Sequence, residues 1–164
     1  MKFQRVTPFL WFNGNAEEAA RFYVKIFPNS KIGRIMRTPE GVPGPASGVL
    51  TVEFTLDGQQ FAAMNGGPGF PHSNAVSFVI HCKNQKEADR YWTKLLAGGG
   101  KPQACGWLVD RFGLSWQVTP DLLLDLMMDK DRAKAARVAA AMMKMIKIDI
   151  AALKKAAAAP KGKK

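Results

Sequence analysis

Four polar residues of this chain have side chains that could bind or act on a small molecule. They are Glu53, Ser77, His81 and Gln117. Each stands in a short segment where polar and apolar residues alternate, so its side chain would lie on the face opposite the apolar ones. A carboxylate in a semi-enclosed site can accept a proton, so Glu53 is the candidate catalytic residue, as a general base. A second interpretation stays open, in which Glu53 pairs with an Arg or Lys across the sheet.

The alternation of polar and apolar residues predicts β-strands that would position these side chains. In residues 48–56, Val52 and Phe54 share one face, whereas Thr51 and Glu53 share the other. The apolar faces suit helix packing, and the polar faces predict a curved sheet around a semi-polar pocket. In the alternative, the polar faces meet water, as antiparallel sheets often allow.

Aromatic residues could add apolar walls to such a pocket, as they do in many ligand sites. Phe9, Trp11 and Trp107 are the candidates. The predicted ligand-binding residues are therefore Phe9, Trp11, Thr51, Ser77, His81, Trp107 and Gln117.

One helical segment occurs twice in the chain. Residues 18–27 (EAARFYVKIF) recur 69 positions later as residues 87–96 (EADRYWTKLL), with Glu, Ala, Arg and Lys at identical offsets. Asn15, the predicted N-cap of the first helix, corresponds to Asn84 before the second. A match at a fixed offset indicates a duplicated supersecondary unit.

Each copy reads as a βαβββ module, which predicts an α+β fold with a curved mixed sheet around a pocket, plus C-terminal helices. Residues 3–65 form the first module, residues 66–74 a linker and residues 75–120 the second module. The predicted strands are residues 5–12, 30–36, 48–56, 59–65, 75–82, 101–104, 105–110 and 114–119. Pro8 places the first strand at a sheet edge or a bulge, and Asp57-Gly58 predicts a tight hairpin turn.

Residues 121–158 are predicted to be a helical extension. Its helices are expected at residues 122–128, 131–145 and 150–158, the last with Asp149 as N-cap. Their Met and Ile side chains would pack on the parent domain or on a partner chain, and the sequence leaves both open. Residues 159–164 are predicted to be a disordered basic tail.

The net charge of +11 is concentrated at the C-terminal end. Residues 129–164 hold 11 Lys and Arg against 3 Asp and Glu, whereas residues 1–128 hold 13 against 10. A nearly neutral body with a basic end indicates a solubilising tail, and nucleic acid is not the expected partner.

Length and composition are those of an ordinary globular domain, with 164 residues of which 47% are hydrophobic. No run approaches the ~18 apolar residues that span a bilayer, and the first residues lack a signal-peptide core, so a cytoplasmic protein with no membrane partner is expected. Cys82 and Cys105 are the only cysteines. Alternation gives Cys82 a buried apolar role, and Cys105 could line the pocket.

The module sequences resemble a known superfamily. Residues 9–23 (FLWFNGNAEEAARFY) and 105–117 (CGWLVDRFGLSWQ), within the duplicated βαβββ pattern, resemble the vicinal oxygen chelate superfamily. It includes glyoxalase I, ring-cleaving dioxygenases and bleomycin-resistance proteins. More closely, the chain looks like the PhnB-like branch, often labelled demethylubiquinone methyltransferase. The resemblance covers residues 3–120, and residues 147–153 also resemble that branch.

In metal-dependent relatives, two modules supply His and Glu ligands to one divalent ion. The resemblance places these ligand positions at about Pro8, Glu53, Ser77 and Gln117. Only Glu53 has the chemistry of a metal ligand, and a divalent ion needs about three or four His, Asp, Glu or Cys ligands. His81 does not complete the set without a shifted register. We therefore predict no metal site and no cofactor.

The same placement conflicts with the aromatic walls. If Pro8 points into the pocket, strict alternation turns Leu10 and Phe12 inward in place of Phe9 and Trp11. A bulge at Pro8 would reverse this.

The methyltransferase label requires a glycine-rich turn from a parallel strand into a helix if S-adenosylmethionine binds in the common fold. Residues 66–69 lead into a strand, and residues 98–100 follow a helix. The sequence therefore does not support that label.

The sequence predicts a homodimeric protein that binds a small molecule without a metal and whose ligand it does not name. One alternative is a metal-dependent enzyme of the glyoxalase or dioxygenase kind. Another is an interaction module that acts through the basic helical tail.

Overall fold

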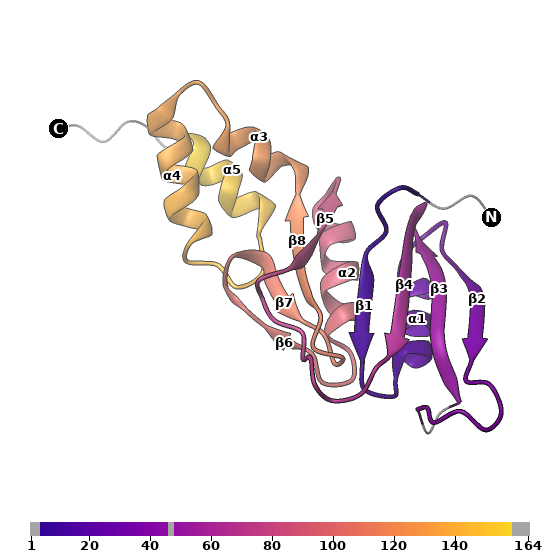
Figure 1. Ribbon diagram of the computed structural model, residues 1–164. Helices are drawn as coiled ribbons and strands as arrows, with labels where there is room; N and C mark the ends of the chain where they lie inside the picture. Colours follow the sequence, from indigo (N-terminus) through magenta and orange to yellow (C-terminus); the bar gives the residue numbers. More distant parts are fainter. Residues whose placement is uncertain (1–3, 46–47, 159–164) are drawn as a thin grey trace. The chain divides into compact units, whose positions relative to one another are not determined.

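The structure is a computed structural model that describes residues 4–45 and 48–158 (Figure 1). The chain divides into two compact units, Met1–His72 and Ser73–Lys164. Within the described residues, no helix has the length and apolar character that crossing a membrane requires.

The first unit is a four-stranded mixed sheet with one helix across one face (Figure 1). Its elements are β1 (Phe9–Phe12), α1 (Ala16–Val24), β2 (Lys31–Arg37), β3 (Val49–Leu56) and β4 (Gln59–Asn65). The strand order is β1-β4-β3-β2, with β1 parallel to β4 and the other pairs antiparallel. The strand β1 lies at the sheet edge, as Pro8 indicates, and begins four residues later than expected.

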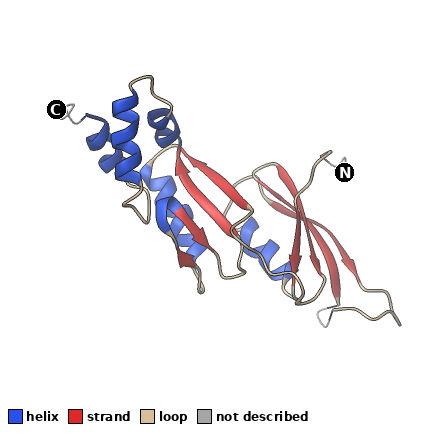
Figure 2. Cartoon of the chain, turned by 60° about the vertical axis from the view of Figure 1, so that its left-hand side comes forward, coloured by secondary structure: helices blue, strands red, loops and turns tan. Residues whose placement is uncertain are grey.

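The second unit repeats this arrangement with strand order β5-β8-β7-β6. Its elements are β5 (Ser77–Cys82), α2 (Gln85–Leu96), β6 (Lys101–Pro102), η1 (Ala104–Gly106), β7 (Trp107–Val109), β8 (Ser115–Pro120), α3 (Asp121–Met127), α4 (Arg132–Met142) and α5 (Ile150–Ala158). β5 is parallel to β8, as β1 is to β4. The α+β class, the duplicated βαβββ modules and the C-terminal helices are confirmed (Figure 2).

Each sheet buries one face against the helix of its own module. In the first unit Val52 and Phe54 are buried on β3, and the Tyr23 ring of α1 stacks on Phe54 with a centroid distance of 6.3 Å. In the second unit Leu108 and Trp116 are buried in the same way. Period-two alternation then leaves the opposite face of each sheet uncovered by that helix.

The start of α1 differs from expectation. Asn15 occupies the N-cap position, but its side chain makes no capping hydrogen bond. Instead the Ala16 amide donates to Oδ1 of buried Asn65, whose Nδ2 donates to the Val49 carbonyl. The acceptor therefore comes from β4, while Asn84 caps α2 directly by accepting from the Glu87 amide.

The turn between β7 and β8 is organised by the buried carboxylate of Asp110, which is only 3% exposed. Its Oδ1 accepts from the amides of Phe112 and Leu114, and its Oδ2 accepts from the Trp116 indole at 2.8 Å. These bonds fix the turn predicted at residues 110–113. The predicted Asp57-Gly58 turn is also present, with φ values of 44° and 84°.

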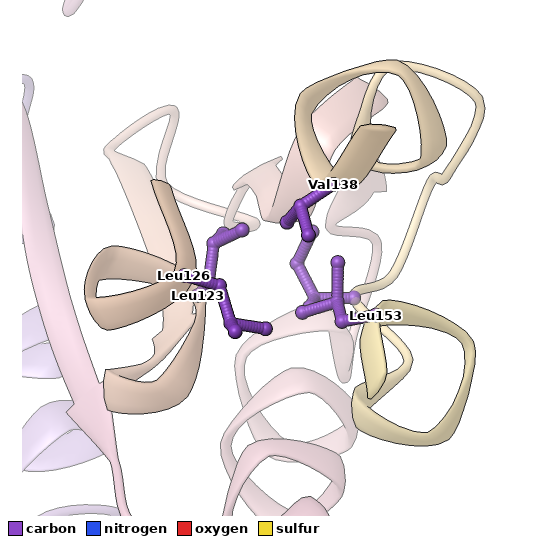
Figure 3. Close-up of a cluster of buried hydrophobic side chains, with 5 residues drawn as sticks. Leu123, Leu126, Val138 and Leu153 are labelled. Atoms are coloured by element: carbon purple, nitrogen blue, oxygen red, sulfur yellow. The ribbon is translucent and has the colours of Figure 1, made fainter. Parts of the chain in front are cut away.

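The three C-terminal helices pack around a shared apolar cluster. Figure 3 shows its labelled side chains converging from all three helices: Leu123, Leu126, Val138 and Leu153. The fully buried Ile148 also belongs to it. The α4 helix ends at Met142, three residues before its expected end, and the predicted tail at residues 159–164 lies outside the described residues.

This extension is held on its parent unit. Gln85, the first residue of α2, donates to the Ile148 carbonyl and accepts from the Ile150 amide. The amides of Cys105 and Gly106 donate to the carbonyls of Met145 and Ile146 at 2.8 and 2.7 Å. These bonds attach the extension to its parent unit, whereas Met128, Met143 and Ile146 stay exposed, so packing of the Met and Ile side chains on a partner chain stays a prediction.

Replacing Asp110 with Ala should lower the free energy of unfolding by about 2–4 kcal/mol, because buried N–H groups lose their acceptor. Asp125 is exposed on α3, and Asp125→Ala should change stability by no more than about 0.5 kcal/mol. Chemical denaturation followed by circular dichroism measures both. Equal losses in the two variants would contradict the role given to Asp110.

Candidate functional site

Four predicted site residues share one face of the first sheet. Phe9 pairs with Ala62, which pairs with Glu53, so the three stand in one row across β1, β4 and β3. Trp11 and Thr51 flank Met64 in the next row. Phe9 is 58% exposed.

The neighbours of Phe9 and Trp11 on β1 face the other way. Leu10 and Phe12 are 7% and 4% exposed and belong to the core. The sequence left open which residues of this strand lie on the same face as Glu53. The structure shows that they are Phe9 and Trp11. Whether they contact a ligand stays a prediction.

Glu53 pairs with an arginine across the sheet. Arg34 Nε donates to Glu53 Oε2 at 2.9 Å, and Nη2 donates to Oε1 at 2.7 Å. Both carboxylate oxygens are thus engaged in a bidentate pair, and the hydrogen bond with the carboxylate raises the pKa of Arg34 above its usual value. The Arg34 side chain is 67% exposed and that of Glu53 is 22% exposed. The sequence allowed Glu53 either to act as a base or to pair with an Arg or Lys across the sheet, and this contact is the pairing.

A β-bulge sets up this pair. The register between β2 and β3 shifts between Ile32 and Ile35, so Gly33 and Arg34 together stand opposite Glu53. A Cβ on Gly33 would lie 3.1 Å from the Glu53 carbonyl oxygen. Glycine therefore allows the close approach, and the extra residue turns Arg34 toward Glu53. A glycine inside a strand is the sequence signal for such a bulge, which the alternation of polar and apolar residues does not reveal.

A shallow depression lies beside Glu53. Its volume is about 10 Å³, roughly the space of one water molecule. It is lined by Thr7, Gly33, Glu53, Phe54, Thr55, Gln60 and Phe61. Of the predicted site residues in this unit, only Glu53 borders it, and a ligand larger than water would lie on the sheet face.

The Trp11 side chain is held by the segment that follows β4. Its indole Nε1 donates to the Gly67 carbonyl at 2.8 Å, and the Phe70 ring meets it edge-on at a centroid distance of 5.0 Å. A Cβ on Gly66 would overlap the indole ring. This segment therefore fixes the orientation of the ring at the edge of the sheet.

In the second unit, three predicted site residues are adjacent. Gln117 of β8 lies between Trp107 of β7 and Val79 of β5 in the register. Gln117 Nε2 donates to Ser77 Oγ at 2.9 Å. The side-chain amide oxygen of Gln117 is an acceptor, and the indole of partly buried Trp107, in the same row, is a donor.

His81 lies on β5, farther along this strand than Ser77. Its Nδ1 lies 3.4 Å from Oδ1 of Asp121, the first residue of α3, and both side chains are more than half exposed. Asp121 was not predicted as a neighbour of the site, because it follows the last strand. The pair places a carboxylate next to His81.

The two cysteines have different environments. Cys82 is fully buried, and this burial raises the pKa of its thiol to about 12, so its predicted apolar role fits the structure. Cys105 has a left-handed backbone (φ 59°), and its Sγ lies 3.8 Å from Met143 Sδ. Its thiol therefore contacts the chain after α4.

The residues at the superfamily's ligand positions do not fit a divalent ion. Both Glu53 oxygens are bound by Arg34, whose positive charge repels a cation, and the Gln117 amide is bound to Ser77. Across residues 4–45 and 48–158, no three His, Cys, Asp or Glu side chains form a group that could hold a metal ion. No chemical step is therefore assigned to a metal.

The turns from parallel strands into helices bear on the methyltransferase label. The turn from β1 to α1 contains one glycine, Gly14, and the turn from β5 to α2 consists of Lys83 and Asn84. Neither is the glycine-rich loop that approaches a nucleotide in the common cofactor-binding fold.

Comparison with known proteins identifies relatives of the two modules. Residues 4–119 match the family model described as 3-demethylubiquinone-9 3-methyltransferase. The PhnB protein of Bacillus cereus is 36% identical, with a TM-score of 0.66, and the match covers 71% of this chain and 99% of that chain. No curated protein sequence matches the chain.

Two more distant structures show the fold alone. A protein of Pseudomonas aeruginosa is 23% identical, with a TM-score of 0.56, over 70% of this chain and 95% of that chain. The fosfomycin resistance protein FosX of Mesorhizobium loti is 13% identical, with a TM-score of 0.50, over 71% of this chain and 90% of that chain.

Gly66→Ala should destabilise the first unit by about 1–3 kcal/mol, because the new methyl group overlaps the Trp11 ring. Gly69 lies in the same segment, and a methyl group added there would meet no atom within 4 Å. Gly69→Ala should therefore stay within about 0.5 kcal/mol of the parent. Thermal and chemical denaturation measure both variants.

The double variant Gly66→Ala/Trp11→Phe separates the contact from a general backbone effect. If the indole is the obstacle, the two changes are non-additive, and the Gly66→Ala loss shrinks when the ring is smaller. Additive losses would show that the Gly66 penalty arises elsewhere.

Proposed function

The chain belongs to the PhnB-like family of the vicinal oxygen chelate fold, and on that premise we propose that it is a cytoplasmic protein that binds a small organic molecule without a metal or other cofactor. The observation that carries the proposal is the composition of the two sheet faces turned away from the helices. Each combines an aromatic side chain with a hydrogen-bonding group in the same row of paired residues: Phe9 with Glu53, and Trp107 with Gln117.

These faces suit a ligand with both an apolar and a polar part. Phe9 and Trp107 offer flat apolar surface, and Gln117 offers a carbonyl acceptor beside the indole donor of Trp107. Thr51 and Ser77 add hydroxyl groups, and Trp11 and His81 add rings. Apolar walls with a few oriented polar groups are the common composition of small-molecule sites.

Glu53 is better placed for binding than for catalysis. To act as a base it would have to accept a proton on an oxygen that Arg34 already binds at 2.7 or 2.9 Å. The bidentate pair positions Arg34 beside the carboxylate, so that a ligand meets the two side chains as a unit.

The proposal is tested by a thermal-shift screen of the purified protein against metabolites and divalent metals, together with metal analysis. A binding metabolite at 100 times its Kd should stabilise the fold by about 2.7 kcal/mol. Glu53→Gln should reduce this shift if the face of the first sheet binds the ligand, and Gln117→Leu should reduce it if the face of the second sheet does. The exposed variant Asp125→Ala should keep it.

Two outcomes would overturn parts of the proposal. A stoichiometric divalent ion that is lost in Glu53→Gln would show a metal-dependent protein. Conversion of the bound molecule, with a rate that collapses in Glu53→Gln, would show an enzyme with Glu53 as its base. Recovery of the ligand chemically unchanged supports binding alone.

The homodimer predicted from the sequence is part of the same proposal. Sedimentation equilibrium of the full chain should give twice the 18.0 kDa chain mass. A single species at the monomer mass over the micromolar range would contradict it.

A further inference from the structure

A second cluster of potential ligands lies outside both sheet faces, where η1 meets the chain after α4. Cys105 Sγ and Met143 Sδ are 3.8 Å apart at the surface of the second unit. Met143 is 67% exposed and Cys105 is partly buried, so solvent reaches the pair from the Met143 side. No step of the proposed function uses either residue.

The pair is held in place by the backbone. Cys105 adopts a left-handed conformation (φ 59°, ψ 34°), which is uncommon for a residue other than glycine. The amides of Cys105 and of its neighbour Gly106 are fixed to the carbonyls of Met145 and Ile146 at 2.8 and 2.7 Å. Two backbone hydrogen bonds therefore hold the segment of Cys105 next to the segment that follows α4, without any bound ligand.

A carbonyl oxygen lies close to the thiol. Cys105 Sγ lies 3.7 Å from the Met142 carbonyl oxygen, at the C-terminal end of α4, where the helix dipole is negative. Thiolate and thioether are soft donors, which select monovalent copper over hard cations such as magnesium or calcium. Two metal–sulfur bonds of about 2.3 Å reach across at most about 4.6 Å, so a separation of 3.8 Å lets one ion bind both sulfurs at a bent angle.

We propose that Cys105 and Met143 form a surface site for a single Cu(I) ion. On binding, the S–H bond of Cys105 breaks, a sulfur–copper bond forms and the proton passes to solvent, while Met143 donates a lone pair and no electron is transferred. The bent arrangement leaves a position for a third ligand from outside the chain, so the site suits a transferable ion. It is independent of the ligand site proposed on the sheet faces.

Competition for Cu(I) under anaerobic conditions tests the site. The full-length protein, mixed with the Cu(I) complex of bicinchoninate, should withdraw one ion per chain, and its affinity should rise with pH because the thiol proton is released. Cys105→Ser should abolish the binding, and Met143→Leu should weaken it by about tenfold or more.

Two controls share the chemistry but lie elsewhere. Met128, the C-cap residue that follows α3, is 80% exposed, and Met128→Leu should leave the affinity unchanged. Cys82→Ala should also retain the ion, because that thiol is fully buried. Circular dichroism checks that each variant is folded, and Met143→Leu, which changes an exposed side chain, keeps the test valid if Cys105→Ser does not fold.

Failure to withdraw Cu(I), or equal binding by Cys105→Ser and the parent, would overturn the site. Equal losses in Met143→Leu and Met128→Leu would show copper held by surface methionines in general, and would overturn it as well. None of these results bears on the thermal-shift screen for the sheet faces, so the two proposals fail separately.

Discussion

Coverage of one sheet face by one helix is the constraint on which the rest of both units depends. A βαβββ module has a single helix, so its four strands can bury only one face in this way. Strict alternation then assigns every strand residue either to that core or to the opposite face. Val52 and Phe54 pack under α1, and Glu53 between them must therefore point the other way. The candidate site is made of the residues that the core does not use.

Much of this arrangement could be predicted, because alternation and repetition are local properties of a sequence. The strand that contains Glu53 and the second copy of the module were found in that way. Pairing of Glu53 with an Arg or Lys was one of two interpretations, but the identity of the partner was not found, because the bulge at Gly33 shifts the register by one residue and alternation alone cannot show this. The acceptor at the start of α1 was also missed, since Asn65 lies 49 residues from the amide that it binds. Contacts of this kind depend on tertiary packing.

The two modules keep the family architecture while their ligand positions have a different chemistry. Arg34 binds both oxygens of Glu53, the one residue with the chemistry of a metal ligand at the positions that the resemblance implies, and a neutral amide stands at residue 117. The Bacillus cereus relative is matched over 99% of its length by 71% of this chain. The helices α3 to α5 lie beyond the residues 4–119 that match the family model, although they belong to the second unit.

The hydrogen bonds between Gln85 and residues 148 and 150 imply that the two modules are completed at different times during synthesis. A ribosome delivers the chain from its N-terminus, and domains fold as units during synthesis. All four strands of the first sheet are present once Asn65 has emerged. Two of the hydrogen-bond partners of Gln85, the first residue of α2, lie at Ile148 and Ile150, which are 63 and 65 residues farther along the chain. The first module can therefore complete its fold while the second still waits for residues 148–150, although both modules share one sequence pattern.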